Sequence, residues 1–283
     1  MFCSRGAWAF PVFLFSTLGV AQKSQDAFVA KPSQESILPD APSATKLMSM
    51  NSADTTVSSQ NQPTGGFVGL VKRGVRDQVE IYSAPFHKSA IKFDLGVAAI
   101  TAGLIVTEPD SSEQFADISK SPSLRFSDVG LYGTMGTVGA FYLSGLVTHD
   151  AHAKETGLLG AEAIANTAIT FNVLKIATGR ERPLIATQNG RFWRYNQLGS
   201  SFPSGHATMT WAGATVVAHE FPKRWVQILA YGGASAVAFS RYSGRRHYPS
   251  DVFVGSVVGY FIGSHIFHAH CREGLSDACD AQK

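Results

Sequence analysis

Two clusters of basic and small polar residues have the residue types and spacing to hold a phosphate group. In "KIATGRERP", Lys175 precedes Arg182 by seven positions at the end of an apolar run. In "SFPSGHATMT", Ser204, Gly205 and His206 stand where a helix is expected to begin. The free N–H groups and the positive end of a helix dipole face outward at such a start, which favours an anion. Arginine adds a two-pronged grip on phosphate oxygens.

A third cluster, "SRYSGRRHYPSD", carries residues suited to nucleophilic chemistry. Pro249 stands where a first helical turn begins, which places His247 just before that helix and Asp251 about one turn inside it. At that separation the carboxylate can accept the proton of one imidazole nitrogen and leave the other nitrogen unprotonated. His206 could then protonate the departing alcohol of a phosphate ester. One histidine must be neutral and the other charged, so their environments are expected to separate their pKa values.

The three clusters together resemble the three-part signature of the type 2 phosphatidic acid phosphatases. That superfamily also contains bacterial non-specific acid phosphatases and vanadium-dependent haloperoxidases. The resemblance covers about residues 67–270 and implies a helical bundle that needs no metal or other cofactor. It also implies a phosphohistidine intermediate on His247, oriented by Asp251, with His206 as the acid. The implied phosphate contacts come from Lys175, Arg182, Ser204, Gly205 and Arg241.

Six apolar segments must position these clusters. They are rich in Ala, Gly, Val and Leu, show few strand-like alternations, and lie at Leu95–Thr107, Val129–Val147, Leu158–Ile176, Ala207–Ala218, Trp225–Ser240 and Val252–Phe267. Glycines inside them are typical of helices that approach closely. The sequence therefore predicts an all-α fold with a six-helix core bundle. Valines at helical spacing from residue 67 predict an additional N-terminal amphipathic helix, which packs on the domain or lies on a membrane surface.

The ends of the chain predict export. Residues 1–21 have the single positive charge, short apolar run and small residues of a signal peptide. Residues 22–66 are polar and lack an apolar period, which predicts a disordered linker. The domain is expected over 67–270 and a tail over 271–283, where Cys271 and Cys279 either form a disulfide or remain free thiols.

Charge and hydropathy bound the partners. The net charge is +3 and 16% of residues are charged, with no basic run of the kind that binds nucleic acid. Two apolar runs are short for membrane spans, and Glu162, Asn166 and Asn172 interrupt a third, where we expect them to hydrogen-bond between helices. We therefore expect a bundle in the periplasm or cell envelope that touches a membrane, with an integral membrane form as the alternative.

The predicted function is hydrolysis of phosphate monoesters, with a phosphorylated small molecule or lipid as substrate. The alternatives are a vanadate-dependent haloperoxidase and a phosphate- or lipid-binding module without turnover. The leaving group and the oligomeric state stay open. Residues of "QNGRFWRYNQLGS" could contact substrate or cap the bundle. The histidines of "THDAHAKE" and "HIFHAH" could be drawn as metal ligands, but solvated loops are the expected reading.

Overall fold

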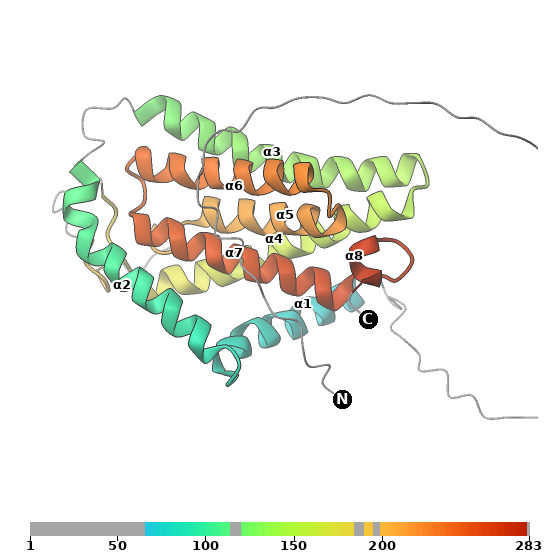
Figure 1. Ribbon diagram of the computed structural model, residues 1–283, viewed down its shortest axis with the longest axis horizontal. Coiled ribbons are helices and arrows are strands. Elements are labelled where there is room, and N and C mark those ends of the chain that lie inside the picture. Colours follow the sequence, from blue (N-terminus) through green and yellow to red (C-terminus); the bar gives the residue numbers. More distant parts are fainter. Residues whose placement is uncertain (1–65, 114–119, 184–189, 195–198, 282–283) are drawn as a thin grey trace, which may run out of the picture. The chain divides into compact units, whose positions relative to one another are not determined.

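The computed structural model describes residues 66–113, 120–183, 190–194 and 199–281. The predicted signal peptide and almost all of the predicted linker lie outside these residues. The helices that the structure describes are α1 (Gly66–Ser83), η1 (Ala84–Phe86), α2 (Ile91–Glu113), α3 (Lys120–Val147), α4 (Ala151–Thr178), α5 (Gly205–Glu220), α6 (Arg224–Ser243), α7 (Pro249–His270) and α8 (Asp277–Asp280) (Figure 1).

The six predicted core segments all form helices. Each lies inside one of α2 to α7, and the observed helices extend beyond the apolar runs by a few residues at most ends. The prediction of an all-α bundle is confirmed. Helix α1 adds a further helix at the N-terminal side of this core, and α8 is a single short turn in the C-terminal tail.

Helices α5 and α7 are held in register by three glycines of α7. A Cβ atom added to Gly259 would lie 2.2 Å from the backbone oxygen of Thr208, so only glycine fits there. Gly255 faces Ser204 in the same way, and Gly263 faces Ala212. Positions four residues apart on one helix thus meet positions four residues apart on the other, so the two helices run parallel. Their N-terminal ends therefore lie side by side.

The ends of two further helices reach the same place. Helix α4 ends at Gly179, whose φ of 50° is left-handed and whose N–H bonds to the Lys175 carbonyl, so Lys175 lies in its last turn. Arg241 lies in the last turn of α6. The C-terminal ends of α4 and α6 thus accompany the N-terminal ends of α5 and α7, as the sequence predicts for the three clusters.

Helix α1 contacts the core through its polar residues. Arg73 donates two hydrogen bonds to the carboxylate of Glu162, and Gln78 donates to the Asn166 side chain at 2.7 Å. The interhelical role expected for Glu162 and Asn166 is therefore confirmed. Asn172 differs, because its side chain bonds the Ala168 carbonyl of its own helix at 2.8 Å.

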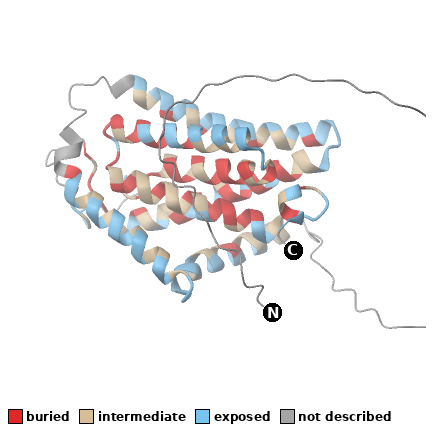
Figure 2. Cartoon of the chain, viewed as in Figure 1, coloured by how far each residue is buried: buried red, intermediate tan, exposed pale blue. Residues whose placement is uncertain are grey.

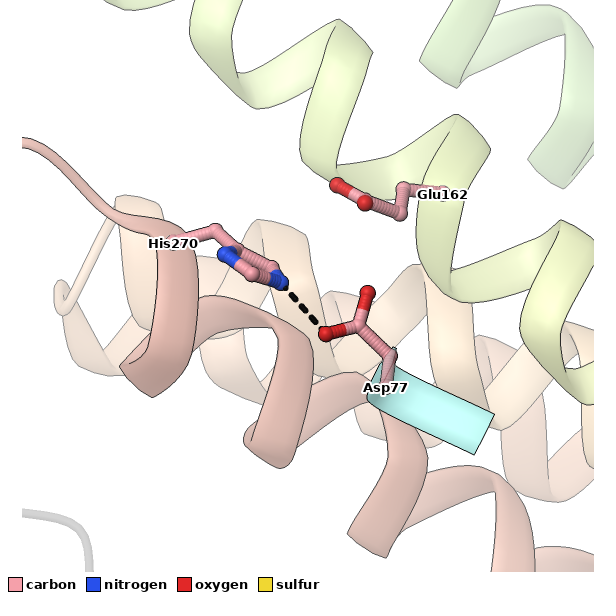
Figure 3. A group of neighbouring side chains, drawn as sticks. All are labelled: Asp77, Glu162 and His270. Carbon is pink, nitrogen blue, oxygen red and sulfur yellow. Dashed lines mark hydrogen bonds and ion pairs between the residues drawn. The ribbon is translucent and has the colours of Figure 1, made fainter. Parts of the chain in front are cut away.

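A buried acidic and histidine cluster also lies on this contact (Figure 3). The Nε2 atom of His270 lies 2.8 Å from Asp77 Oδ1, and Glu162 completes a group whose ligand-type atoms lie within 4.8 Å of one another. Each carboxylate already has a partner, Arg73 for Glu162 and His270 for Asp77. The cluster serves here as the polar contact that holds α1 against α4 and α7.

The expected reading of the remaining histidines as solvated loop residues is wrong for several of them. His265, His268 and His270 belong to α7 rather than to a loop. His270 is paired as described, and His265 Nε2 lies 3.6 Å from a carboxylate oxygen of Glu80. His152 lies in α4 with Nε2 2.9 Å from the buried Glu220. Charged partners on other helices hold these rings, which the sequence spacing does not reveal.

The C-terminal tail is closed by a disulfide between Cys271 and Cys279. Cys279 is buried in the hydrophobic core with Phe267. The tail is also tied to the bundle by Arg272, which forms an ion pair with the buried Glu155 of α4. Of the two alternatives left open by the sequence, the structure has the disulfide.

The outer surface of the bundle is apolar. Valines 71, 75 and 79 of α1 are 48% to 63% exposed, and large apolar side chains are exposed along α2, α3, α4 and α6 as well. Figure 2 shows buried residues gathered on the inner helices and exposed ones on the outer helices. Helices α4 and α7 are long and apolar enough to cross a membrane, and the bent pair of α1 and α2 would make a third span.

We predict that Gly259→Ala destabilises the protein. The added methyl group must push α5 and α7 apart, at a cost of about 1–3 kcal/mol from overpacking, which exceeds the gain of alanine in helix propensity. Thermal unfolding in detergent should show a lower Tm. Gly103→Ala on α2 is the matched control, because nothing lies within 4 Å of its added methyl group. Equal Tm values for the two variants would contradict the close packing.

Candidate active site

His247 is held in a buried position just before α7. Its side chain is 2% exposed, and Nδ1 lies 2.7 Å from the carbonyl oxygen of Ser201. A carbonyl can only accept a hydrogen bond, so Nδ1 carries the proton and the lone pair of the neutral ring is on Nε2. The pKa of His247 is lowered to about 3, mainly by burial. The positive charges of Arg182 and Lys175 contribute to this lowering, and Asp251 opposes it. The ring is therefore neutral at ordinary pH, as a nucleophile requires.

Asp251 acts on His247 less directly than the sequence predicts. Its Oδ2 lies 3.7 Å from His247 Nδ1, beyond hydrogen-bond distance. That oxygen instead accepts hydrogen bonds from the Tyr248 N–H at 2.8 Å and from the Ser201 hydroxyl. The other oxygen accepts from Arg180 Nη1 at 2.6 Å. The i,i+4 spacing does bring the two residues together, but the N–H of His247 donates its hydrogen bond to the backbone carbonyl of Ser201.

His206, in the first turn of α5, contacts a carboxylate that the sequence analysis did not find. Its Nε2 lies 3.0 Å from Asp128 Oδ1 on α3. The pKa of His206 is lowered to about 4, mainly by burial and by the positive charge of Arg241. Lys175 also lowers it, and Asp128 raises it. The pKa values of both histidines are thus lowered, whereas the sequence analysis expected one neutral and one charged ring.

The three predicted cations lie near the start of α5, and each donates a hydrogen bond to a neutral group. Lys175 is 5% exposed and donates to the Ser200 carbonyl at 2.6 Å. Arg182 donates to the Gly199 carbonyl at 2.7 Å. Arg241 donates to the Ser127 hydroxyl at 2.8 Å and lies 3.5 Å from Asp128. Carbonyl partners fix Lys175 and Arg182 without cancelling their charge, whereas Asp128 offsets part of the charge of Arg241, so the site keeps a net positive charge.

Two buried polar atoms of this site have no hydrogen-bond partner among the described residues. They are the hydroxyl oxygen of Ser204 and Nε of Arg241. Ser204 is fully buried at the N-cap of α5, yet its side chain makes no capping bond. Gly205 is the first residue of that helix, where backbone N–H groups have no intrahelical partner. Unpaired buried donors are costly, so this arrangement suits an oxyanion such as phosphate or vanadate.

Arg180 does not join the cations around α5, although it lies in the first cluster. It is 1% exposed and forms ion pairs with Asp251 and with Glu108 of α2. Its guanidinium lies 4.7 Å from the Phe192 ring centre and 4.4 Å from that of Tyr248. Of the loop expected to contact substrate, residues 188–189 and 195–198 lie outside the described residues.

Sequence reasoning missed Asp128, Glu108 and Ser201 as site residues. Asp128 and Glu108 come from α3 and α2, which carry none of the three motifs. Ser201 opens the quoted "SFPSGHATMT" stretch, just before the cis Phe202–Pro203 peptide bond. Nothing in the sequence pattern marks this serine as a site residue. The eight predicted residues come from the ends of α4, α5, α6 and α7 and from the segments beside those ends. They contact one another or the loop at residues 199–201.

A family model of the PAP2 superfamily, the type 2 phosphatidic acid phosphatases, matches residues 157–274. This range holds all three clusters. Residues 157–274 are thus similar to the PAP2 superfamily. The match begins within α4 and ends after α7, so it leaves out α1, α2 and α3.

Proteins similar to this chain include phosphatases with lipids in their names. The chain is 28% identical over 161 residues to a PA-phosphatase related-family protein of Dictyostelium discoideum, covering 50% of this chain and 58% of that one. It is 28% identical over 160 residues to lipid phosphate phosphatase 1 of Arabidopsis thaliana, covering 44% and 46%. It is 36% identical over 76 residues to lipid A 1-phosphatase of Porphyromonas gingivalis, covering 26% and 17%. The chain thus matches less than two thirds of the length of each.

A solved structure is also similar to part of this chain. It is the transmembrane PAP2 type phosphatidylglycerolphosphate phosphatase from Bacillus subtilis, with a TM-score of 0.41 and 19% identity over 73% of this chain and 98% of that one.

The lowered pKa of His247 predicts a pH dependence of stability. The unfolded chain takes up a proton near the ordinary histidine pKa of about 6.5, but folded His247 does not until about pH 3. This contribution to stability is complete above about pH 6.5 and is lost as the pH falls. In His247→Asn, Tm should fall less steeply between pH 6.5 and 4 than in the wild type. The exposed His87→Asn should keep the wild-type slope, and an unchanged slope in His247→Asn would count against a neutral buried ring.

Asp128 is expected to keep His206 protonated enough to act as an acid. In Asp128→Asn the supporting carboxylate charge is lost, so the pKa of His206 should fall further. We predict a roughly tenfold loss of kcat on an alkyl phosphate, whose poor leaving group needs the proton, within the range for general acid catalysis. The loss on p-nitrophenyl phosphate should be small. Asp150→Asn, at the opposite end of α4, is the control, and equal losses on both substrates would remove Asp128 from the proton transfer.

Proposed function

We propose that this protein is a membrane-associated phosphatase that hydrolyses phosphate monoesters of lipids through a phosphohistidine on His247. The observation that carries the proposal is the set of buried donors without partners, the Ser204 hydroxyl and Arg241 Nε, among cations beside a buried neutral histidine. A phosphate group supplies the acceptors that these donors lack.

The first chemical step forms a bond from Nε2 of His247 to phosphorus and breaks the bond between phosphorus and the ester oxygen. The leaving oxygen takes a proton from the His206 imidazolium. Lys175, Arg182, Arg241 and the N–H groups at the start of α5 bind the non-bridging oxygens and hold the negative charge of the transition state. The proton stays on Nδ1 of His247 throughout, where it is hydrogen-bonded to the Ser201 carbonyl.

The second step returns the enzyme to its starting state. A water molecule attacks phosphorus and gives its proton to His206, which is now neutral and acts as the base. The bond between phosphorus and Nε2 breaks, inorganic phosphate leaves, and His206 is again an imidazolium. His206 thus donates one proton and accepts one in each cycle, so no other proton carrier is needed.

The lipid substrate is supported by the surface of the bundle. The exposed valines of α1 and the apolar faces of the outer helices would be costly in water, whereas the polar contacts of α1 point inward. Such an arrangement suits hydrocarbon, where polar groups must be satisfied internally. The phosphatase names of the relatives agree with a phosphorylated lipid.

Export is supported by the disulfide. A bond between Cys271 and Cys279 persists in oxidising compartments and is rare in the cytosol. We therefore place the C-terminal tail outside the cytoplasm, together with the predicted signal peptide. The disulfide lies after α7, whose other end carries the catalytic residues. If α7 crosses the membrane, the active site lies near the opposite face.

A phosphate-release assay tests the function. Full-length protein in detergent with EDTA should release phosphate from phosphatidic acid in mixed micelles, and His247→Ala should lose activity on the order of 10³-fold or more. His87→Ala, an exposed histidine, is the matched control. Rapid acid-free quenching with ³²P-labelled substrate should label the wild type at a base-stable, acid-labile histidine. Release that survives in His247→Ala, or no release by the folded wild type, would refute the proposal.

A further inference from the structure

We infer that Ser201 aligns His247 through its backbone carbonyl, and that a relay of buried side chains from Glu108 of α2 through Arg180 and Asp251 holds Ser201. This inference rests on the proposed function of His247 as the nucleophile. It makes Ser201, Arg180 and Glu108 positioning residues, since each acts through another group rather than on the substrate. It also gives α2, which lies outside the family match, a part in catalysis.

Ser201 is fixed by three hydrogen bonds. Its carbonyl accepts from His247 Nδ1 at 2.7 Å, its N–H donates to the Arg180 carbonyl at 2.8 Å, and its hydroxyl donates to Asp251 Oδ2. The residue is fully buried. Three bonds on three different groups leave this peptide one orientation, and the imidazole follows it. Asp251 therefore reaches His247 mainly through the Ser201 hydroxyl.

Asp251 is itself clamped. Its Oδ1 accepts a hydrogen bond from Arg180 Nη1, and its Oδ2 accepts from the Tyr248 N–H in addition to the Ser201 hydroxyl. The side chain is fully buried, so the arginine charge is what offsets the cost of burying the carboxylate. If Arg180 turned away, Asp251 would lose its counter-charge and its fixed position together.

Arg180 is clamped as well. The same Nη1 bonds the Ser250 hydroxyl at 2.7 Å, and Nε bonds the Gly190 carbonyl at 3.1 Å. The rings of Phe192 and Tyr248 lie within 5 Å of its guanidinium carbon. The remaining arm, Nη2, donates to Glu108. Because the guanidinium is planar and rigid, holding Nη2 on Glu108 sets the direction in which Nη1 points at Asp251.

The last residue of the relay is Glu108 on α2. Among the described side chains of α2 it is the buried one, at 3% exposed, while Val106 two residues earlier is 79% exposed. Glu108 also accepts from the Ser250 hydroxyl and lies 3.3 Å from the Ser250 N–H. A single carboxylate thus joins the C-terminal part of an apolar, exposed helix to the beginning of α7. Movement of α2 would reach the nucleophile by this route.

The test compares Ser201→Ala and Glu108→Gln with a matched control. The control is Glu162→Gln, which removes the charge of another buried glutamate that pairs with an arginine. Glu162 lies in the middle of α4, away from the end of α4 at the site. We expect Ser201→Ala to lower kcat about tenfold by misaligning the nucleophile, with KM within twofold of the wild type. Glu108→Gln should lower kcat severalfold, again with unchanged KM, because the phosphate-binding cations are untouched. Ser201→Thr keeps the hydroxyl and should restore most of the kcat.

A double-mutant cycle decides whether the residues act as one relay. If they do, Ser201→Ala with Glu108→Gln should cost less than the product of the single losses, because either change already frees His247. The relay is wrong if Ser201→Ala keeps the wild-type kcat while Asp251→Asn loses it, since Asp251 then acts directly. It is also wrong at α2 if Glu108→Gln behaves as Glu162→Gln does. These outcomes need an active wild type, so they are distinct from failure of the proposed function, in which the wild type itself releases no phosphate.

Discussion

The close approach of α5 and α7 is the constraint on which the site depends. Gly255, Gly259 and Gly263 let the two backbones meet over three successive turns, and this register fixes the N-terminal ends of both helices at one level. The Ser204 N–H bonds the Asp251 carbonyl at 3.0 Å, which closes that register at the site itself. The proposed phosphate-binding start of α5 and the proposed nucleophile before α7 are therefore parts of one rigid unit. A slip of one turn would separate them by about 5 Å.

The bundle has polar contacts between its helices as well as a hydrophobic core, and large apolar side chains are exposed on its surface. Polar and charged side chains join the helices from within, as in the contacts of Arg73 and Gln78 on α4, and exposed apolar side chains such as Val71, Val75 and Val79 lie on the outside. In the proposed membrane-embedded form, packing is driven by close contact and internal hydrogen bonds, since apolar surface gains little by leaving lipid. This accounts for both the glycine register and the buried ion pairs, because small residues and satisfied polar groups are what hold helices together in hydrocarbon.

The sequence predicts the residues of the site far better than their partners. The helices and the meeting of four helix ends follow from apolar runs and from breaks at Gly179 and Pro249, which are local signals. Asp128 and Glu108 are single carboxylates on helices without a motif, so only the packing of α3 and α2 reveals them. The spacing of His247 and Asp251 correctly predicts their proximity. It does not predict that the Ser201 carbonyl lies nearer, because that segment is 46 residues earlier in the chain.

The lowered pKa values of both histidines follow from one cause and have different consequences. Burial and the surrounding cations disfavour a charged ring at His247 and at His206. For the nucleophile this keeps the lone pair available. For the acid it would be a defect, but His206 also faces Asp128, whereas the ring of His247 faces a neutral carbonyl. A phosphate ester brings up to two negative charges among Lys175, Arg182 and Arg241, which removes much of the repulsion that an imidazolium meets there. In the proposed mechanism, substrate binding thus favours protonation of His206, whose ring hydrogen-bonds a carboxylate, and gives the two histidines different charges.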